Sequence, residues 1–323
     1  MNFGAYHSFD SMKMTDILGC VIWAAFFLLA LSWIPFVGPF LSLLTPLPFL
    51  YYSTKLGLYQ GMKLAALTIL TVALAAKLVG YPQIIIFSVE FGIFGLVCSE
   101  LFKKKLSIGQ TIFLATVFLL LLGLIVLFFI GLYKNAGPLE MLLDYLEGHL
   151  KVTTKAYEEM GISKENAVEL EVYGKAFIDT ISKIYPSLMI IGSGFAAWLN
   201  VVIARPLFRR RNLKYPDFIP MDRWQAPDVL IWVVIVSGFA LFLPSQGIKL
   251  VAINALIVML AIYFFHGLSI ILFFLNKYHV PSWIRIGIYV LIIIQQIFLA
   301  GLILAGLFDQ WVDFRKIHRR ADK

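Results

Sequence analysis

Residues 111–133 read TIFLATVFLLLLGLIVLFFIGLY and include no charged side chain. A helix that crosses the hydrocarbon core of a bilayer needs about 20 consecutive, predominantly apolar residues. The segment therefore has the length and the composition of a membrane-spanning helix.

The rest of the chain shares this character, since 60% of its 323 residues are hydrophobic and only 14% are charged. Soluble domains carry about 25% charged residues, and a soluble fold of this composition would lack polar side chains to cover its apolar surface. The net charge of +8 includes short basic runs beside apolar segments, at 103–105 and 209–211. Such runs are typical of cytoplasmic loops that meet anionic lipid, so the bilayer is an expected partner and nucleic acid is not.

Similar apolar segments recur along the sequence, several of them bounded by glycine, proline or charged residues. They predict an all-α, polytopic transmembrane helix bundle with about eight or nine membrane helices. The expected helices are 17–34, a short one from about Pro46 to Gly57, 63–79, 82–102, 111–133, 185–208, 229–243, 249–275 and 284–307.

A proline-rich stretch follows the first expected helix, and three prolines within 36–52 exclude one smooth helix there. We expect a surface loop over 35–45, followed by a short helix that begins at Pro46 and ends near Gly57. The loop either gates a cavity or is a rigid connector. The residues of this candidate gating loop are Pro35, Gly38, Pro39, Pro46 and Pro48.

A polar region at 134–182 interrupts the apolar segments and carries more acids than lysines. Two stretches in it place apolar residues at three- and four-residue intervals, which predicts an amphipathic helical hairpin between membrane helices five and six. We therefore expect a six-helix core over 1–212, which includes this acidic extracytoplasmic hairpin, and a three-helix segment with a basic tail over 213–323.

Lysine and arginine placement predicts the orientation in a bacterial cytoplasmic (inner) membrane. The basic loops at 102–108 and 205–225 should be cytoplasmic, which puts the hairpin outside. Nine crossings would place the tail at 315–323 outside as well, although basic residues favour the cytoplasmic side. The side of the membrane that holds the tail is therefore left open. Trp311, Phe314 and the tail arginines are interpreted as an interfacial anchor, with partner docking as the alternative.

Two motifs resemble known families. The segment 47–61, LPFLYYSTKLGLYQG, looks like the second and third helices of energy-coupling-factor (ECF) transporter S-components, which implies a six-helix core that binds a vitamin or a metal. The run 306–316, GLFDQWVDFRK, together with Asn254, Tyr263 and His266-Gly267-Leu268, resembles the YybS-like family of predicted bacterial membrane proteins. No function is assigned to that family, so this resemblance predicts a membrane protein and nothing more specific.

No phosphate-binding loop, zinc motif or nucleophile elbow is present, so neither an enzyme nor a cofactor is expected. The two cysteines, Cys20 and Cys98, lie in apolar segments and predict no metal site. Polar residues inside membrane helices are costly and mark functional sites. The candidate substrate-binding residues are Glu90, Asn200, Asn254 and His266.

Each of these four has a second interpretation, as a hydrogen-bonded clamp between helices. The leading hypothesis is small-molecule binding and transport by an S-component-like core. The alternative is a non-transporting scaffold of the cell envelope similar to MreD, which would bind a membrane protein partner.

Overall fold

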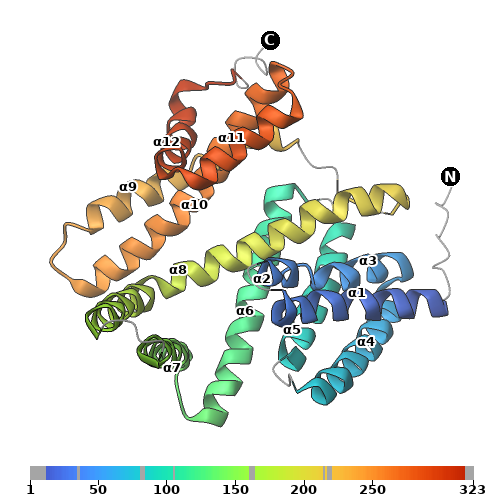
Figure 1. The fold of residues 1–323 in the computed structure, drawn as a ribbon. Coiled ribbons are helices and arrows are strands. Elements are labelled where there is room, and N and C mark those ends of the chain that lie inside the picture. The colour runs from blue at the N-terminus through green and yellow to red at the C-terminus, as the bar shows by residue number, and fades with distance from the viewer. Residues whose placement is uncertain are drawn as a thin grey trace. The chain divides into compact units, whose positions relative to one another are not determined.

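The structure, a computed structural model, describes residues 12–34, 37–80, 84–104, 106–159, 164–213, 215–216 and 220–316. All its regular elements in these ranges are helices (Figure 1). The chain forms two compact units, the first of residues 1–127 and 192–218, the second of 128–191 and 219–323. Helices α6 and α8 contribute to both units. The expected division near residue 212 stays a prediction.

The first unit is built around the short helix α3, Pro46–Leu56. Leu47, Phe49, Leu50 and Leu56 of this helix are at most 3% exposed, and α3 contacts α1, α4 and α5. The helices of the unit are α1 (Met14–Trp33), α2 (Gly38–Ser42), α3, α4 (Leu58–Val79), α5 (Ile84–Lys103), the first part of α6 (Ile108–Lys134) and the end of α8 (Lys164–Arg210).

The predicted start and end of α3 are confirmed. A helix leaves its first four N–H groups without partners, which is costly inside an apolar core. Here Thr45 donates to the Ser42 carbonyl and Leu47 to the Leu44 carbonyl, while Pro46 and Pro48 have no N–H to satisfy. At the other end, Gly57 ends the helix with φ 84°, a left-handed value that favours glycine.

The predicted loop at 35–45 is only partly irregular, because it contains the one-turn helix α2. Pro35 lies outside the described residues. Gly38 and Pro39 begin α2, and Pro46 and Pro48 lie within α3. The gating role of these residues stays a prediction.

The second unit contains the amphipathic helix α7, Pro138–Glu159, and the first part of α8, which are the two helices predicted in this region. The extracytoplasmic placement of this hairpin stays a prediction. Its remaining elements are the 3₁₀ turn η1 (Met221–Arg223), α9 (Leu230–Ala240), α10 (Gln246–Lys277), α11 (Ser282–Ile294) and α12 (Gln296–Val312). Helix α10 contacts η1, α9 and α12, so it organises the C-terminal part of the unit.

The expected start of a helix at residue 185 is wrong, because the 47-residue helix α8 runs without a break from Lys164 through Pro186 to Arg210. In a regular α-helix the Ser187 N–H would bond the Lys183 carbonyl. The Asn254 side chain of α10 bridges the two groups: its Oδ1 accepts from Ser187 N at 2.9 Å, and its Nδ2 donates to Lys183 O at 2.8 Å. A side chain inserted into the backbone ladder thus supports α8 beside the proline.

The segment 284–307, expected as one helix, is broken in the structure. Helices α11 and α12 are separated at Gln295, which is extended (φ −103°, ψ 107°), and their axes differ by 100°. No proline or glycine marks this break in the sequence, so its position could not be predicted from helix-breaking residues.

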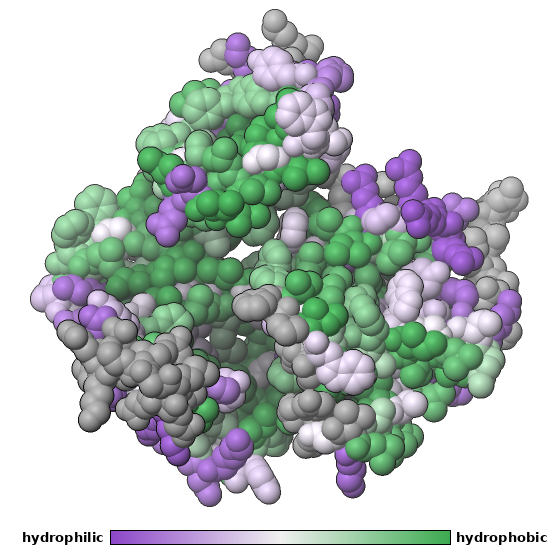
Figure 2. All heavy atoms as spheres, viewed as in Figure 1, coloured by the Kyte–Doolittle hydropathy of each residue, from purple (hydrophilic) through white to green (hydrophobic). Residues whose placement is uncertain are grey.

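Within the described ranges, five helices are long and apolar enough to cross a membrane, or six if the bent pair α11–α12 counts as one span. Helices α1 and α9 are apolar but shorter, so fewer segments reach spanning length than the eight or nine expected. The all-α membrane bundle itself is confirmed. Figure 2 shows apolar residues over much of the visible surface and hydrophilic residues in smaller patches, as expected of a protein that faces lipid.

Candidate functional site

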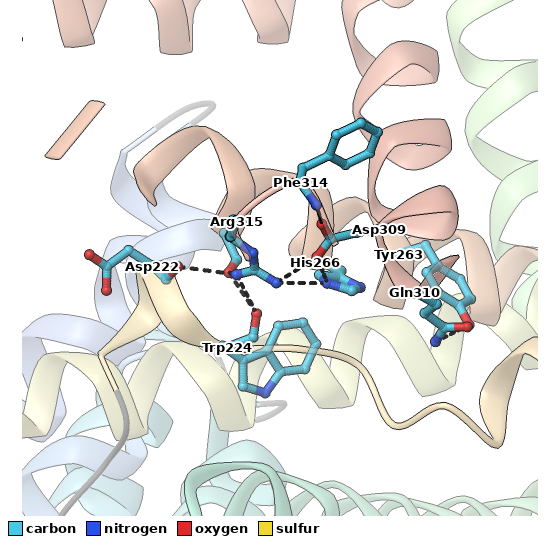
Figure 3. Close-up of polar contacts among 9 residues, drawn as sticks. Asp222, Trp224, Tyr263, His266, Asp309, Gln310, Phe314 and Arg315 are labelled. Carbon is cyan, nitrogen blue, oxygen red and sulfur yellow. Dashed lines mark hydrogen bonds and ion pairs between the residues drawn. The ribbon is translucent and has the colours of Figure 1, made fainter. Parts of the chain in front are cut away.

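The second unit buries a cluster of charged and polar groups between α10, α12 and the segment after η1 (Figure 3). At its centre is Arg315, which follows α12 and is 2% exposed. We call the groups that accept its hydrogen bonds the acceptor cage. They are the Asp309 carboxylate, His266 Nε2, Ser269 Oγ and the backbone carbonyls of Asp222 and Trp224.

Two glycines bring α10 and α12 together beside the cage. A Cβ added to Gly267 would lie 2.0 Å from the Leu302 carbonyl oxygen, and one added to Gly306 would lie 2.2 Å from the Tyr263 carbonyl oxygen. Both contacts are to backbone atoms, so the helices could not keep this separation with alanine at either position. Small residues allow such close packing in membranes, and here they bring Asp309 within reach of His266.

The two terminal nitrogens of Arg315 make all of its contacts with the cage. Nη2 donates to Asp309 Oδ2 at 2.8 Å and lies 3.0 Å from His266 Nε2. Nη1 donates to Ser269 Oγ at 2.7 Å and to the carbonyl oxygens of Trp224 at 3.0 Å and Asp222 at 3.1 Å. The inner nitrogen, Nε, is buried and has no partner among the described residues.

Asp309 is held by both of its oxygens. Oδ2 contacts Arg315 and His266, while Oδ1 accepts the Phe314 N–H at 2.8 Å. Phe314 can reach back because Asp313, at the end of α12, is left-handed with φ 47°. The carboxylate therefore holds the Arg315 guanidinium through one oxygen and the backbone after α12 through the other.

His266 lies where the charged side chains of Asp309 and Arg315 meet. Its Nε2 is 3.1 Å from Asp309 Oδ2, and its ring stacks near Tyr263 and meets Trp224 edge to face. A neutral ring that accepts from Arg315 carries its proton on Nδ1. Nδ1 is buried and has no partner among the described residues, so the cage keeps unused hydrogen-bonding capacity.

Burying these three groups is expensive. Removing a charge from water costs several kcal/mol per ion, about as much as a well-placed partner returns. Asp309 and Arg315 each have 0% side-chain exposure and compensate one another. Because apolar residues of similar volume would pack as well or better, stability alone gives little reason for charges here.

Of the four predicted site residues, only His266 belongs to the cage. Asn254 also lies on α10, but its amide contacts α8 and not α12. Glu90 and Asn200 lie in the first unit. A substrate-binding role for these four residues stays a prediction.

Asn200 connects α8 to the candidate gating loop. Its Nδ2 donates to the Leu43 carbonyl, between α2 and α3, at 2.7 Å and to the Ala196 carbonyl of its own helix at 2.8 Å. Asn200 is fully buried, and its Oδ1 has no partner among the described residues. The structure thus brings together Asn200 and the candidate gating loop, which the sequence had suggested as separate features.

Glu90 faces α6 from α5. Its Oε1 lies 3.3 Å from the position that a Cβ on Gly123 would occupy. In the described parts of the chain, no basic residue forms an ion pair with it. Glu90 is therefore a partly buried carboxylate placed against a glycine.

Sequence reasoning missed Asp309 and misplaced Arg315. Arg315 was expected among exposed anchoring residues of the basic tail, which is wrong for this residue because its side chain is fully buried. A signal was present: an aspartate near the end of an apolar helix precedes an arginine by six residues. That spacing indicates a pair only if the chain turns back after the helix, which the left-handed Asp313 makes possible.

Comparison with known proteins agrees with the membrane fold. The family described as predicted membrane protein (DUF2232) matches residues 21–310. The uncharacterized protein YybS of Bacillus subtilis (strain 168) is 20% identical over 312 residues, which cover 94% of this chain and 99% of that protein. No solved structure matches the chain. The resemblance to YybS-like proteins is thereby confirmed, and the chain belongs to the DUF2232 family of predicted membrane proteins.

Proposed function

We propose that this protein binds a small solute inside the bacterial cytoplasmic membrane and transports it. The observation that carries the proposal is the acceptor cage, which brings Asp309, His266 and Arg315 together inside a unit made largely of apolar helices. Ionisable residues within membrane segments are rare and typically belong to substrate, ion or proton pathways.

Partly unused hydrogen-bonding groups support a binding role. His266 Nδ1 in the second unit and Asn200 Oδ1 in the first are buried and without partners among the described residues. Buried polar groups are normally paired, so each unpaired atom could form a hydrogen bond with a bound solute. The resemblance of residues 47–61 to S-components favours the same class of function.

The proposal can be tested first by thermal unfolding of the purified protein in detergent. The panel would contain amino acids, polyamines, vitamins, nucleosides and divalent cations at millimolar concentration. A solute present at 100 times its Kd stabilises the folded state by about 2.7 kcal/mol, which raises Tm measurably. We expect at least one solute to do so.

Uptake of that solute into proteoliposomes then separates transport from binding. We expect uptake above that of protein-free vesicles and its loss in Asp309→Asn, with Asp179→Asn as the control. Asp179 forms an exposed ion pair with Lys183. Binding without uptake, or uptake equal to that of empty vesicles, would refute transport.

A scaffold similar to MreD is the second candidate function, and the surface of the hairpin favours it. Helices α7 and α8 border an open hollow of about 620 Å³. Charged side chains of both signs line it, including Glu147, Lys151, Lys155, Glu171 and Lys175. Cross-linking from Lys151 in intact cells should capture a membrane protein partner if the scaffold role is correct. A wild-type cross-linking pattern identical to that of Lys151→Gln would count against it.

A further inference from the structure

We infer that the acceptor cage is a binding site for the terminal amidinium or guanidinium group of a small cationic solute, which Arg315 occupies in this structure. The inference rests on the proposed function, since it names the chemical class of the solute. Arg315 acts as an internal stand-in for that ligand.

The contacts define what the cage recognises. Both terminal nitrogens of Arg315 are bound, Nη1 by three oxygen atoms and Nη2 by Asp309 and His266. The inner Nε makes no contact among the described residues. The cage therefore recognises two adjacent, planar NH₂ groups end-on, and it does not require the third nitrogen of a guanidinium.

The walls of the cage have contacts that do not involve Arg315. Ser269 Oγ donates to the Trp224 carbonyl at 2.7 Å, which fixes the segment after η1 against α10. The close contact of Gly267 with Leu302 fixes α10 against α12. These contacts should keep the acceptors in place after Arg315 has left.

Arg315 is attached in a way that permits it to leave. It follows the end of α12, between Asp313 with φ 47° and Lys316 with φ 53°. Left-handed backbone is unfavourable for residues other than glycine. Withdrawal of Phe314 and Arg315 leaves α12 intact, because the bond that closes the helix, from Asp313 N–H to the Asp309 carbonyl, precedes them. It breaks the bond from Phe314 N–H to Asp309 Oδ1.

The test is chemical rescue of full-length Arg315→Ala in detergent. Methylguanidinium and acetamidinium at millimolar concentration should raise the Tm of this variant by several degrees and should raise wild-type Tm by less, because Arg315 competes for the cage in wild type. Tetramethylammonium, which has the same charge but no N–H donor, should have no effect. Asp309→Asn combined with Arg315→Ala should abolish the rescue. An equal response to tetramethylammonium, or no response, would overturn the inference.

The wild-type protein provides a second measurement in case Arg315→Ala does not fold. Methylguanidinium that competes with Arg315 should free the segment after α12 and increase deuterium exchange of the Phe314 amide. Tetramethylammonium should not. Exchange that is equal with both cations would also overturn the inference.

The two proposals can fail separately. Rescue of Arg315→Ala by methylguanidinium without transport of any solute would support the cage and refute transport. Transport of a neutral or anionic solute that survives the loss of Asp309 would support transport and refute the cage as its site.

Discussion

Arg315 Nη2 lies 2.8 Å from Asp309 Oδ2, and both side chains are completely buried. The pair joins the segment that follows α12 to α12 itself, while His266 and Ser269 connect the same guanidinium to α10. The C-terminal part of the second unit is therefore organised around charge as well as around apolar packing.

Replacement of Asp309 with Asn should destabilise the protein strongly. The Arg315 charge would stay buried without compensation, and breaking a buried ion pair in this way costs about 3–5 kcal/mol. Thermal unfolding in detergent measures the effect as a lower Tm. Asp179→Asn, which breaks an exposed pair with Lys183, should change Tm little. Equal Tm values for the two variants would contradict the burial of the pair.

Replacement of Gly267 with Ala should separate α10 from α12. The new Cβ would meet the Leu302 carbonyl at 2.0 Å, and forced overpacking typically costs about 1–3 kcal/mol. Gly301→Ala is the matched control, because Gly301 lies on α12 with nothing within 4 Å of its Cβ position. We expect a lower Tm for Gly267→Ala and an unchanged or higher Tm for Gly301→Ala. The reverse order would rule out the close helix contact.

Asn254→Leu should weaken α8 beside Pro186. The variant removes the side-chain partner of Ser187 N and of Lys183 O. Ser187 is buried while Lys183 is exposed, so the cost of about 1–3 kcal/mol for an unpaired buried group applies to the Ser187 N–H. Hydrogen exchange should increase at residues 183–187. Thr180→Val is the control, since the Thr180 hydroxyl bonds only the Ala176 carbonyl of its own helix. Unchanged exchange in Asn254→Leu would show that the bridge contributes nothing.

Asn200→Leu should loosen the connection between α2 and α3. The Leu43 carbonyl would lose its side-chain donor, so we expect faster hydrogen exchange over residues 41–47 and a loss of about 1–3 kcal/mol. Thr71→Val serves as the control, because the exposed Thr71 hydroxyl bonds only Leu67 of its own helix. Similar exchange in both variants would show that Asn200 does not stabilise the connection between α2 and α3.

The sequence predicted best those features that depend on local chemistry. The bounds of α3 followed from the fixed φ of Pro46 and the left-handed freedom of Gly57, and the existence of apolar membrane helices followed from composition. Both signals lie within a few residues of the feature they predict.

Features that depend on distant contacts could not be predicted in this way. Pro186 normally favours a helix boundary, and the residue that offsets it, Asn254, lies on another helix. Arg315 carries the same charge as a residue that contacts lipid head groups, and only the turn after α12 places it inside. Of the candidate site, the sequence therefore predicted His266 but neither of its charged partners.

The most direct test is a double-mutant cycle between Asp309 and Arg315, measured as the free energy of unfolding in detergent for Asp309→Asn, Arg315→Gln and the double variant. Residues in direct contact show coupling of about 0.5–3 kcal/mol, and for this completely buried pair we predict a value near the upper end. The double variant should then be more stable than the sum of the two single effects implies. Additive effects, with coupling near zero, would show that the two side chains do not interact and would contradict the buried cage.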